Sequence, residues 1–419
     1  MSRSLFSLLV WFFAAAIFAS SAVAFETRAK SAFVIDQTTG TVLFSKNADE
    51  PLPPASMSKL MTLYVAFEAI RDGRLSLEER LPVSRHAMSY GGSTMFLDTT
   101  DRVSVEDLLR GIIVLSGNDA CAVIAEALSP DGTEAGFARY MTQRAQQLGM
   151  TNSTFKNSNG WPADGHRMSM RDLALISGRI ITDFPEFYKM FAEREFAFDN
   201  RAPQNVQNRN PLLGLGIGVD GLKTGHTQEA GYGLTGSAAQ GNRRVIFVIS
   251  GLETARARAE EAEAIVNWAF RQFAERQVLK AGEVLAEADV WMGDAPKVGL
   301  AARDDFTMVL PVLIGETVPA EIVYSGPFCV DKKSRWMSKE FHFCKESDNE
   351  PNGEGDTNSL EIKKGQELAE LIIRPEGLEE TRVPLVADRD VSPGGFMVRM
   401  KTVSGILLNR LTKGSEGAS

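Results

Sequence analysis

The 419-residue sequence is poor in cysteine, histidine and long apolar runs, and each shortage excludes a class of protein. Three cysteines are too few for the disulfide framework that stabilises small secreted scaffolds. The four histidines are scattered without metal-ligand spacing, so we expect neither a metal site nor another cofactor. A net charge of -9 argues against a general nucleic-acid-binding protein.

The one long apolar run lies at the N-terminus. Arg3 precedes the almost wholly apolar stretch 5–18, and Ala22-Val23-Ala24 forms a small-residue cleavage site. We therefore expect residues 1–24 to be a signal peptide that is removed on export. The alternative is an uncleaved membrane anchor, for which the run is short. The exported protein is then expected not to span the membrane.

The rest of the chain is long enough for two domains, and its pattern changes near residue 276. Before that point the periodicity predicts helices over 58–70, 104–115, 119–128, 136–148, 169–181 and 254–275, and strands over 32–36, 41–44, 219–225, 231–238 and 244–250. Beyond it the strand-like segments are 284–291, 297–300, 306–311, 318–324 and 370–373. The sequence predicts an α/β catalytic domain over 25–276 and a small all-β domain over 277–390.

A last segment follows the hinge Ser392-Pro393-Gly394-Gly395. Over 394–413 its apolar side chains fall on one broad helical arc, with Arg399, Lys401, Arg410 and Lys413 supplying positive charge. This composition predicts an amphipathic helix that lies in the surface of an anionic membrane. The alternative is a terminal helix packed on the β domain.

The cysteines fall into two groups. Cys121 begins a mostly apolar run and is expected to be a buried free thiol. Cys329 and Cys344 are close enough in sequence to pair in an oxidising compartment, but spacing alone does not fix the geometry of a disulfide. The segment 345–358 is polar and predicts a mobile loop.

Three short motifs stand in a fixed order and carry the chemistry: Ser56-Met57-Ser58-Lys59, Ser116-Gly117-Asn118 and Lys223-Thr224-Gly225. Any one of them is a weak signal. Together they indicate acyl transfer through a serine ester, with a lysine in place of histidine as the proton acceptor. This order of motifs shortly after a signal peptide points to an exported acyl-transfer enzyme.

The spacing of Ser56 and Lys59 puts both side chains on one face of a helix, about one turn apart. Lys59 must lose its proton to act as a base, and burial or the second cation Lys223 lowers its pKa from ~10.4. The helix N-terminus favours negative charge on the Ser56 oxygen. The alternative is an unrelated Ser and Lys on a surface helix.

The other two motifs complete the expected site. Ser116 and Asn118 can pass a proton to a leaving amine and hold a peptide backbone, or they can simply cap a helix. Lys223-Thr224-Gly225 is expected to end a strand beside the cleft, where Gly225 admits a close approach of substrate. The N–H groups of Ser56 and His226 are candidates for an oxyanion hole.

These motifs and their neighbours resemble the low-molecular-weight penicillin-binding proteins, specifically serine D-alanyl-D-alanine carboxypeptidases of the penicillin-binding protein 5 and 6 type. The resemblance rests on the segments 54–62, 116–121 and 220–227, and also on 95–97, 208–210 and 230–232. It implies a β-lactamase/transpeptidase-like catalytic domain and no metal. The resemblance in sequence covers residues 30–276. In the β domain only the architecture is similar, and residues 328–358 look like an insertion there.

The resemblance also implies a role for each residue. Ser56 forms the acyl-enzyme, Lys59 is its base, and Ser116 and Asn118 complete the proton and substrate network. The substrate-binding residues are Lys223, Thr224, Gly225, His226 and Arg258, the last facing a terminal carboxylate. Arg209 and His166 match positions that border the cleft.

The function expected from this resemblance is hydrolysis of the terminal D-Ala-D-Ala bond of peptidoglycan pentapeptide stems, with β-lactams as covalent inhibitors. The expected location is the periplasm, with anchoring to the inner membrane through the C-terminal helix. The alternatives are a β-lactamase or a DD-endopeptidase or transpeptidase on the same fold, or a non-catalytic peptidoglycan-binding protein. The intact Ser56 and Lys59 pair argues against the last of these.

Overall fold

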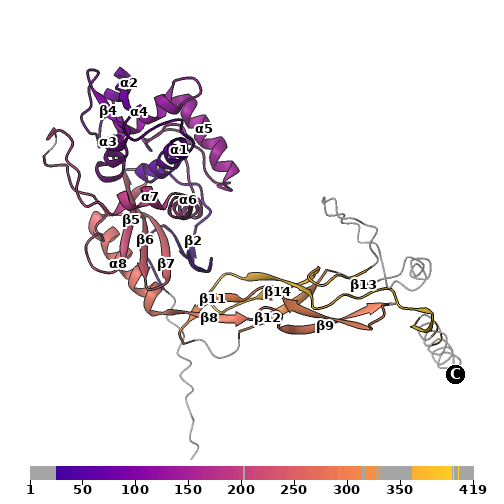
Figure 1. Cartoon of the computed structure of the whole chain (residues 1–419). Helices are drawn as coiled ribbons and strands as arrows, with labels where there is room; N and C mark the ends of the chain where they lie inside the picture. Colours follow the sequence, from indigo (N-terminus) through magenta and orange to yellow (C-terminus); the bar gives the residue numbers. More distant parts are fainter. Residues whose placement is uncertain are drawn as a thin grey trace, which may run out of the picture.

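The computed structural model describes residues 25–201, 203–291, 293–313, 318–325, 328–329, 361–398, 400 and 404. The expected signal peptide, Cys344 and with it the Cys329–Cys344 pair, the loop 345–358 and most of the helix 394–413 lie outside these residues. Figure 1 shows two units: helices around a sheet, and an elongated unit of strands that extends from one end of that sheet.

The first unit is built on an antiparallel sheet of five strands in the order β2-β1-β7-β6-β5. The strands are β1 (Ser31–Asp36), β2 (Val42–Lys46), β5 (Val219–Thr227), β6 (Gly231–Gln240) and β7 (Arg243–Leu252). The strands expected in this part of the chain are confirmed within two residues at each end. β5 is the edge strand, and its free edge faces the turn that carries Ser56.

Helices cover both faces of this sheet. Along β7, Ile246 and Val248 face one core, which contains α1 (Lys59–Arg71), while Val245 and Phe247 face a second core beneath α8 (Ala255–Arg271). The first core also holds α3 (Val105–Arg110), α4 (Asn118–Leu128), α5 (Glu134–Gln147) and α6 (Met170–Asp183). Shorter elements are β3 (Arg80–Pro82), β4 (Arg102–Ser104), α2 (Arg85–Met88), α7 (Pro185–Tyr188) and the turn η3 (Lys189–Ala192).

α1 is buried on nearly every side, so it lacks a polar stripe. It follows directly from a single helical turn, η1 (Ala55–Ser58), which places Ser56 at its start. The burial of α1 fixes the position of this turn against the edge strand β5.

The helix expected over 104–115 is confirmed as α3 followed directly by a π-helical turn, η2 (Gly111–Leu115). Another expected helix is wrong in part. The helix expected over 254–275 ends at Arg271, and Phe273 begins a strand instead. Phe273 is buried against Trp268, with 4.8 Å between ring centroids. In the sequence this apolar residue fits the helical pattern, but in the structure it begins the first strand of the second unit.

The second unit is made of strands around its own core. β8 (Phe273–Leu279) pairs with β11 (Phe306–Pro311), and six strands follow the order β12-β14-β15-β10-β9-β13. Their bounds are β9 (Val284–Trp291), β10 (Lys297–Ala302), β12 (Ala320–Tyr324), β13 (Phe328–Cys329), β14 (Glu367–Ile373) and β15 (Thr381–Ala387). The mixed α/β unit followed by a small β-rich unit confirms the predicted fold class.

Candidate active site

Ser56 and Lys59 meet at the junction of η1 and α1. Lys59 Nζ lies 2.9 Å from Ser56 Oγ, as the three-residue spacing predicts. Lys59 is fully buried, whereas Ser56 is half-buried and remains accessible to a substrate. The alternative of an unrelated Ser and Lys on a surface helix is therefore wrong.

Lys59 Nζ has two further partners, Asn118 Oδ1 at 2.7 Å and the Asn159 carbonyl oxygen at 2.6 Å. Both of these atoms only accept hydrogen bonds. A neutral amine has two N–H donors and one lone pair. It can donate to these two oxygens and keep its lone pair for the Ser56 hydroxyl proton, so the arrangement suits a lysine that acts as a base.

Burial lowers the pKa of Lys59 to about 8, and repulsion from Arg209 adds to the effect. Burial also lowers the pKa of Lys223, with repulsion from Lys59 as the next cause. The sequence predicts the burial and assigns the nearby cation to Lys223. Arg209 was expected only at the border of the cleft, and its effect on the pKa of Lys59 was not predicted. Since repulsion between ammonium groups is mutual, the buried lysines disfavour a doubly protonated pair.

Ser116 and Asn118 lie where η2 meets α4, as expected. Ser116 adopts a left-handed backbone (φ 63°), and Lys223 Nζ donates to its Oγ at 2.9 Å. Gly117, not Ser116, is the N-cap of α4 and no side chain caps that end, so the helix-cap alternative is wrong. Asn118 Nδ2 donates to the Gly91 carbonyl at 2.9 Å, so its amide is oriented with Oδ1 toward Lys59.

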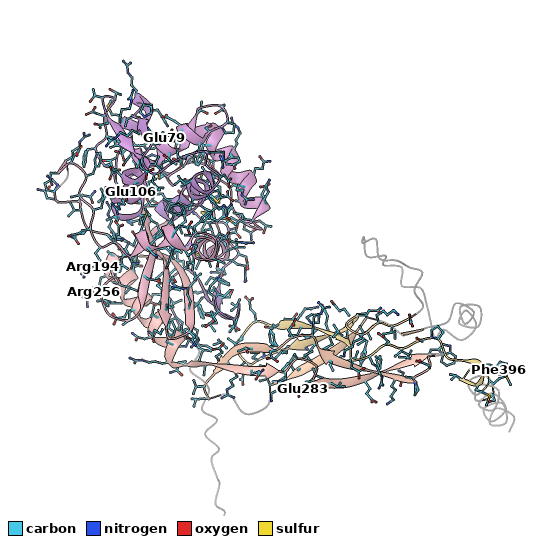
Figure 2. The ribbon with its side chains drawn as sticks, in the orientation of Figure 1. Glu79, Glu106, Arg194, Arg256, Glu283 and Phe396 are labelled. Atoms are coloured by element: carbon cyan, nitrogen blue, oxygen red, sulfur yellow. The ribbon has the colours of Figure 1, made fainter. Side chains whose placement is uncertain are left out.

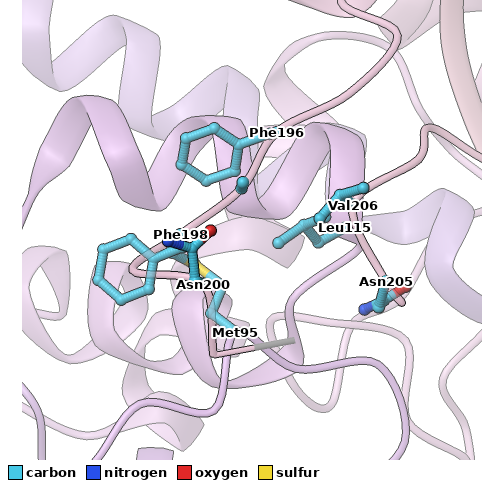
Figure 3. Close-up of a pocket in the computed structure, with 8 residues that line it drawn as sticks. Met95, Leu115, Phe196, Phe198, Asn200, Asn205 and Val206 are labelled. Atoms are coloured by element: carbon cyan, nitrogen blue, oxygen red, sulfur yellow. The ribbon is translucent and has the colours of Figure 1, made fainter. Parts of the chain in front are cut away.

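A mostly apolar hollow lies next to the turn that carries Ser116 (Figure 3). Leu115 and Met95 line it together with Phe196, Phe198 and Val206, which come from the long segment after η3; Leu115 lies beside Val206 and Met95 near Phe198. Met95 also fills the space beside Gly111, where a Cβ would come within 2.0 Å of its sulfur. This packing positions the turn that presents Ser116 and Asn118.

Lys223, Thr224 and Gly225 lie on β5, and all three are buried. A Cβ on Gly225 would lie 3.0 Å from the Pro54 carbonyl oxygen and 3.1 Å from Met57 Cγ. The glycine therefore makes room for the turn that carries Ser56, whereas the sequence assigned that space to substrate. His226 is exposed and stacks on Tyr232, with 3.8 Å between ring centroids.

Arg258 and Arg209 form a cationic cluster with Lys223. Arg258 Nη2 donates to the Arg209 carbonyl at 3.3 Å and lies over the Tyr232 ring. Arg209 reaches Ser93 Oγ at 2.5 Å and the Leu115 carbonyl at 3.2 Å. Among the described residues none of the three forms an ion pair, and the buried Arg258 Nε has no hydrogen-bond partner.

The sequence reasoning missed two residues that hold the base. The Asn159 carbonyl accepts from Lys59, and the buried Glu134 fixes the preceding turn by accepting from Ser158 N at 2.9 Å. Glu134 also accepts from Tyr90 and His86, each at 2.6 Å. The polar run Asn157-Ser158-Asn159-Gly160 was the available signal for a tight, functional turn.

Known proteins resemble this chain in sequence and in fold. The profile of the D-alanyl-D-alanine carboxypeptidase family matches residues 17–254. The chain belongs to this family. A second profile, the C-terminal domain of penicillin-binding protein 5, matches residues 273–329. The family assignment confirms the predicted serine-type peptidase of the low-molecular-weight penicillin-binding proteins and gives no support to a β-lactamase or endopeptidase.

Individual relatives agree with the family assignment. D-alanyl-D-alanine carboxypeptidase DacC of Escherichia coli is 33% identical over 380 residues, which cover 89% of this chain and 86% of that protein. The crystal structure of penicillin-binding protein 5 from Haemophilus influenzae matches with a TM-score of 0.67 at 31% identity, over 88% of this chain and 98% of the other. Penicillin-binding protein D2 of Listeria monocytogenes, solved in the ampicillin-bound form, matches 58% of this chain and 98% of its own with a TM-score of 0.53 at 33% identity.

Proposed function

We propose that Ser56 hydrolyses the terminal D-Ala-D-Ala bond of peptidoglycan pentapeptide stems through an ester intermediate, with Lys59 as its base. The observation that carries this assignment is the buried Lys59 Nζ, 2.9 Å from Ser56 Oγ with its other contacts on two acceptor oxygens. The family and its named relatives supply the substrate class.

In the first step the Ser56 hydroxyl gives its proton to Lys59 while its oxygen attacks the carbonyl carbon of the penultimate D-Ala. The N–H groups of Ser56 and His226 stabilise the oxyanion. Lys59 gives this proton to Ser116 as Ser116, beside Lys223, passes its own hydroxyl proton to the nitrogen of the terminal D-Ala, which leaves Lys59 neutral again. The C–N bond then breaks, and D-Ala leaves with a neutral amine.

The unpaired cations Lys223, Arg209 and Arg258 supply the site for the terminal carboxylate of the stem, together with the Thr224 hydroxyl. In the second step water gives a proton to neutral Lys59 while its oxygen attacks the ester carbon. The bond between that carbon and Ser56 Oγ then breaks, Lys59 returns the proton to Ser56 Oγ, and the shortened stem leaves as a carboxylic acid. A β-lactam carries a similar carboxylate and an amide bond that opens onto the same serine. The ampicillin-bound form of the Listeria relative supports this inhibition.

Release of D-Ala from a purified muropeptide pentapeptide tests the assignment. The wild-type protein should produce the tetrapeptide, whereas Ser56→Ala should produce none. Ser89→Ala, a change of an exposed serine, serves as the matched control and should retain activity. Cleavage of cross-linked dimers instead of pentapeptide indicates an endopeptidase, and rapid turnover of nitrocefin indicates a β-lactamase; either result contradicts the proposal.

We further infer that the protein is periplasmic and held at the inner membrane by its C-terminal segment. Phe396 lies at the end of the β-rich unit farthest from the catalytic sheet (Figure 2), and the side chains of Phe396 and Met397 are 75% and 78% exposed. Exposed apolar side chains next to basic residues favour the surface of an anionic membrane. In the described residues, no helix has the length and apolarity needed to cross a membrane.

Deletion of residues 394–419 tests this location. The truncated protein should move from the membrane fraction to the soluble periplasm and stop binding vesicles of anionic phospholipid. Its activity on soluble pentapeptide should remain, because the catalytic residues all lie before residue 260. A truncated protein that stays with the membrane contradicts the inference.

A further inference from the structure

Glu134 is a buried carboxylate beside the active site that takes no part in the reaction steps described above. It is the first residue of α5, and its side chain is only 7% exposed. Burial raises the pKa of Glu134, but hydrogen bonds from Ser158 and Tyr90 outweigh this effect and hold the pKa below its ordinary value. The group is therefore an anion at neutral pH, and both of its oxygens accept hydrogen bonds.

One oxygen holds the turn that carries Asn159. Glu134 Oε1 accepts from Ser158 N at 2.9 Å and from Ser158 Oγ at 2.5 Å. The Ser158 carbonyl in turn accepts from Oγ1 of Thr62, three residues after Lys59 on α1, at 2.5 Å. Ser158 is therefore fastened from two sides, and the next residue presents its carbonyl to Lys59 Nζ at 2.6 Å.

The other oxygen holds the segment that orients Asn118. Glu134 Oε2 accepts from the Tyr90 hydroxyl at 2.6 Å. The carbonyl of Gly91, the next residue, accepts from Asn118 Nδ2 at 2.9 Å. This bond fixes the amide with its Oδ1 atom toward Lys59 Nζ, 2.7 Å away. The two oxygens of one carboxylate thus lead to the two acceptors that hold the base.

A second buried carboxylate provides a comparison. Glu68, also 7% exposed, joins α1 to α5 through Arg144 Nη2 at 2.6 Å, so a permanent positive charge compensates it. In the part of the chain that the structure describes, Glu134 pairs with no lysine or arginine, and its ionisable partner is His86, which is 53% exposed. A buried charge without a permanent countercharge is costly to the fold and is typical of functional sites.

We propose that Glu134 is a positioning residue that fixes both acceptor oxygens of Lys59 at once. One oxygen of the carboxylate sets the carbonyl in the turn, and the other sets the asparagine amide. With both N–H donors of the neutral amine directed in this way, its lone pair stays on the Ser56 hydroxyl. Without Glu134 each acceptor can move by itself, and the amine can turn away from the hydroxyl proton. The proposal rests on the proposed function, because it takes Lys59 as the base.

The test is the rate of acylation by excess fluorescent penicillin at about pH 9, where about nine tenths of Lys59 is neutral. The first-order rate under these conditions does not depend on the fraction of folded protein. Glu134→Ala should lower this rate about 100-fold, the effect of a base misplaced by about 1 Å. Tyr90→Phe removes one hydroxyl from a partly exposed ring and should lower the rate about 5-fold, the scale of one hydrogen bond.

A double-mutant comparison separates positioning from stability. In the Glu134→Ala background, Tyr90→Phe should lower the acylation rate by less than about 1.5-fold, because the two residues act through one contact. Glu68→Ala is the matched control, since it removes an equally buried carboxylate that also contacts α5. This control should lower the melting temperature and leave the acylation rate unchanged.

The charge of Glu134 gives an independent readout. Burial has the largest effect on the pKa of Lys59 and lowers it to about 8, whereas the anion Glu134 raises it. Glu134→Gln keeps the size of the side chain and removes the charge, so the midpoint of the acylation profile should move below that of the wild-type protein. Glu68→Gln should leave the midpoint in place. The other ionisable groups that act on Lys59 or respond to it are unchanged in these variants: Cys121 and Asp119 on α4, Lys223 on β5, Arg209 and His166.

A Tyr90→Phe variant that is acylated at the wild-type rate overturns the proposal, and so does an undiminished effect of Tyr90→Phe in the Glu134→Ala background. An unmoved midpoint in Glu134→Gln contradicts it as well. If the wild-type protein is not acylated, or its rate does not rise between pH 7 and 9, the proposed function fails instead. The two failures are therefore distinguishable.

Discussion

Replacing Arg209 with glutamine should shift the pH dependence of acylation upward, because Arg209 is the cation that repels the protonated form of Lys59. Burial is the larger cause of the lowered pKa, about 8, and it remains in the variant. Only the contribution of the charge is removed. The midpoint of the acylation profile should therefore move above that of the wild-type protein without reaching the value of a free lysine.

The size of the wild-type effect follows from the pKa. With a pKa of about 8, about one tenth of Lys59 is neutral at pH 7 and about nine tenths at pH 9. The acylation rate should rise about ten-fold over that interval and level off above it. A lysine with an ordinary pKa near 10.4 would be neutral in only about 4 of 10,000 molecules at pH 7.

The assay is the second-order rate of acylation by a fluorescent penicillin at constant ionic strength, since this rate reports the ionisation of the free enzyme. Arg194→Gln is the control, because Arg194 is an exposed arginine at the edge of the catalytic unit (Figure 2). A wild-type rate that does not vary between pH 7 and 9 refutes the assignment of Lys59 as the base. An Arg209→Gln profile with an unchanged midpoint refutes the role of that cation.

Three further substitutions test other parts of the site. Lys59→Arg should lower the acylation rate about 10³-fold, because a guanidinium does not lose its proton near neutral pH; penicillin labelling checks this. Lys223→Ala should slow acylation about 10- to 100-fold with an unchanged melting temperature, and a normal rate would exclude it from the cleft. Gly160→Ala should destabilise the fold by about 2–4 kcal/mol in denaturant unfolding, since its Cβ would lie 1.9 Å from the Ala55 carbonyl oxygen. Gly132→Ala, with a similar φ and open space around it, should cost only about 1 kcal/mol.

The parts of the site that are local in sequence were predictable. A spacing of three residues puts Ser56 and Lys59 on one helical face in any helix, and the structure confirms their contact. The strands of the main sheet were also predictable. In β7 a short, continuous apolar run, Val245 to Ile249, is typical of a strand buried on both faces, and its residues do face two separate cores.

Long-range contacts were not predictable in the same way. Asn159 accepts from Lys59 through its backbone carbonyl. Every residue has such a carbonyl, so the type of residue at this position does not predict the contact. Arg209 acts from a long segment without regular structure, where periodicity gives no information. Phe273 looked like a continuation of α8, since its burial satisfies a helical pattern even though it begins β8. Strand β15 was missed because Pro384 interrupts the expected pattern.

The most direct test of the central claim is the intact mass of the protein after brief incubation with benzylpenicillin, followed by mapping of the modified peptide. The mechanism predicts one penicilloyl group per chain, located on the peptide that contains Ser56 and absent from the Ser56→Ala variant. An unmodified wild-type protein, or an adduct that persists on another residue in Ser56→Ala, would contradict the account.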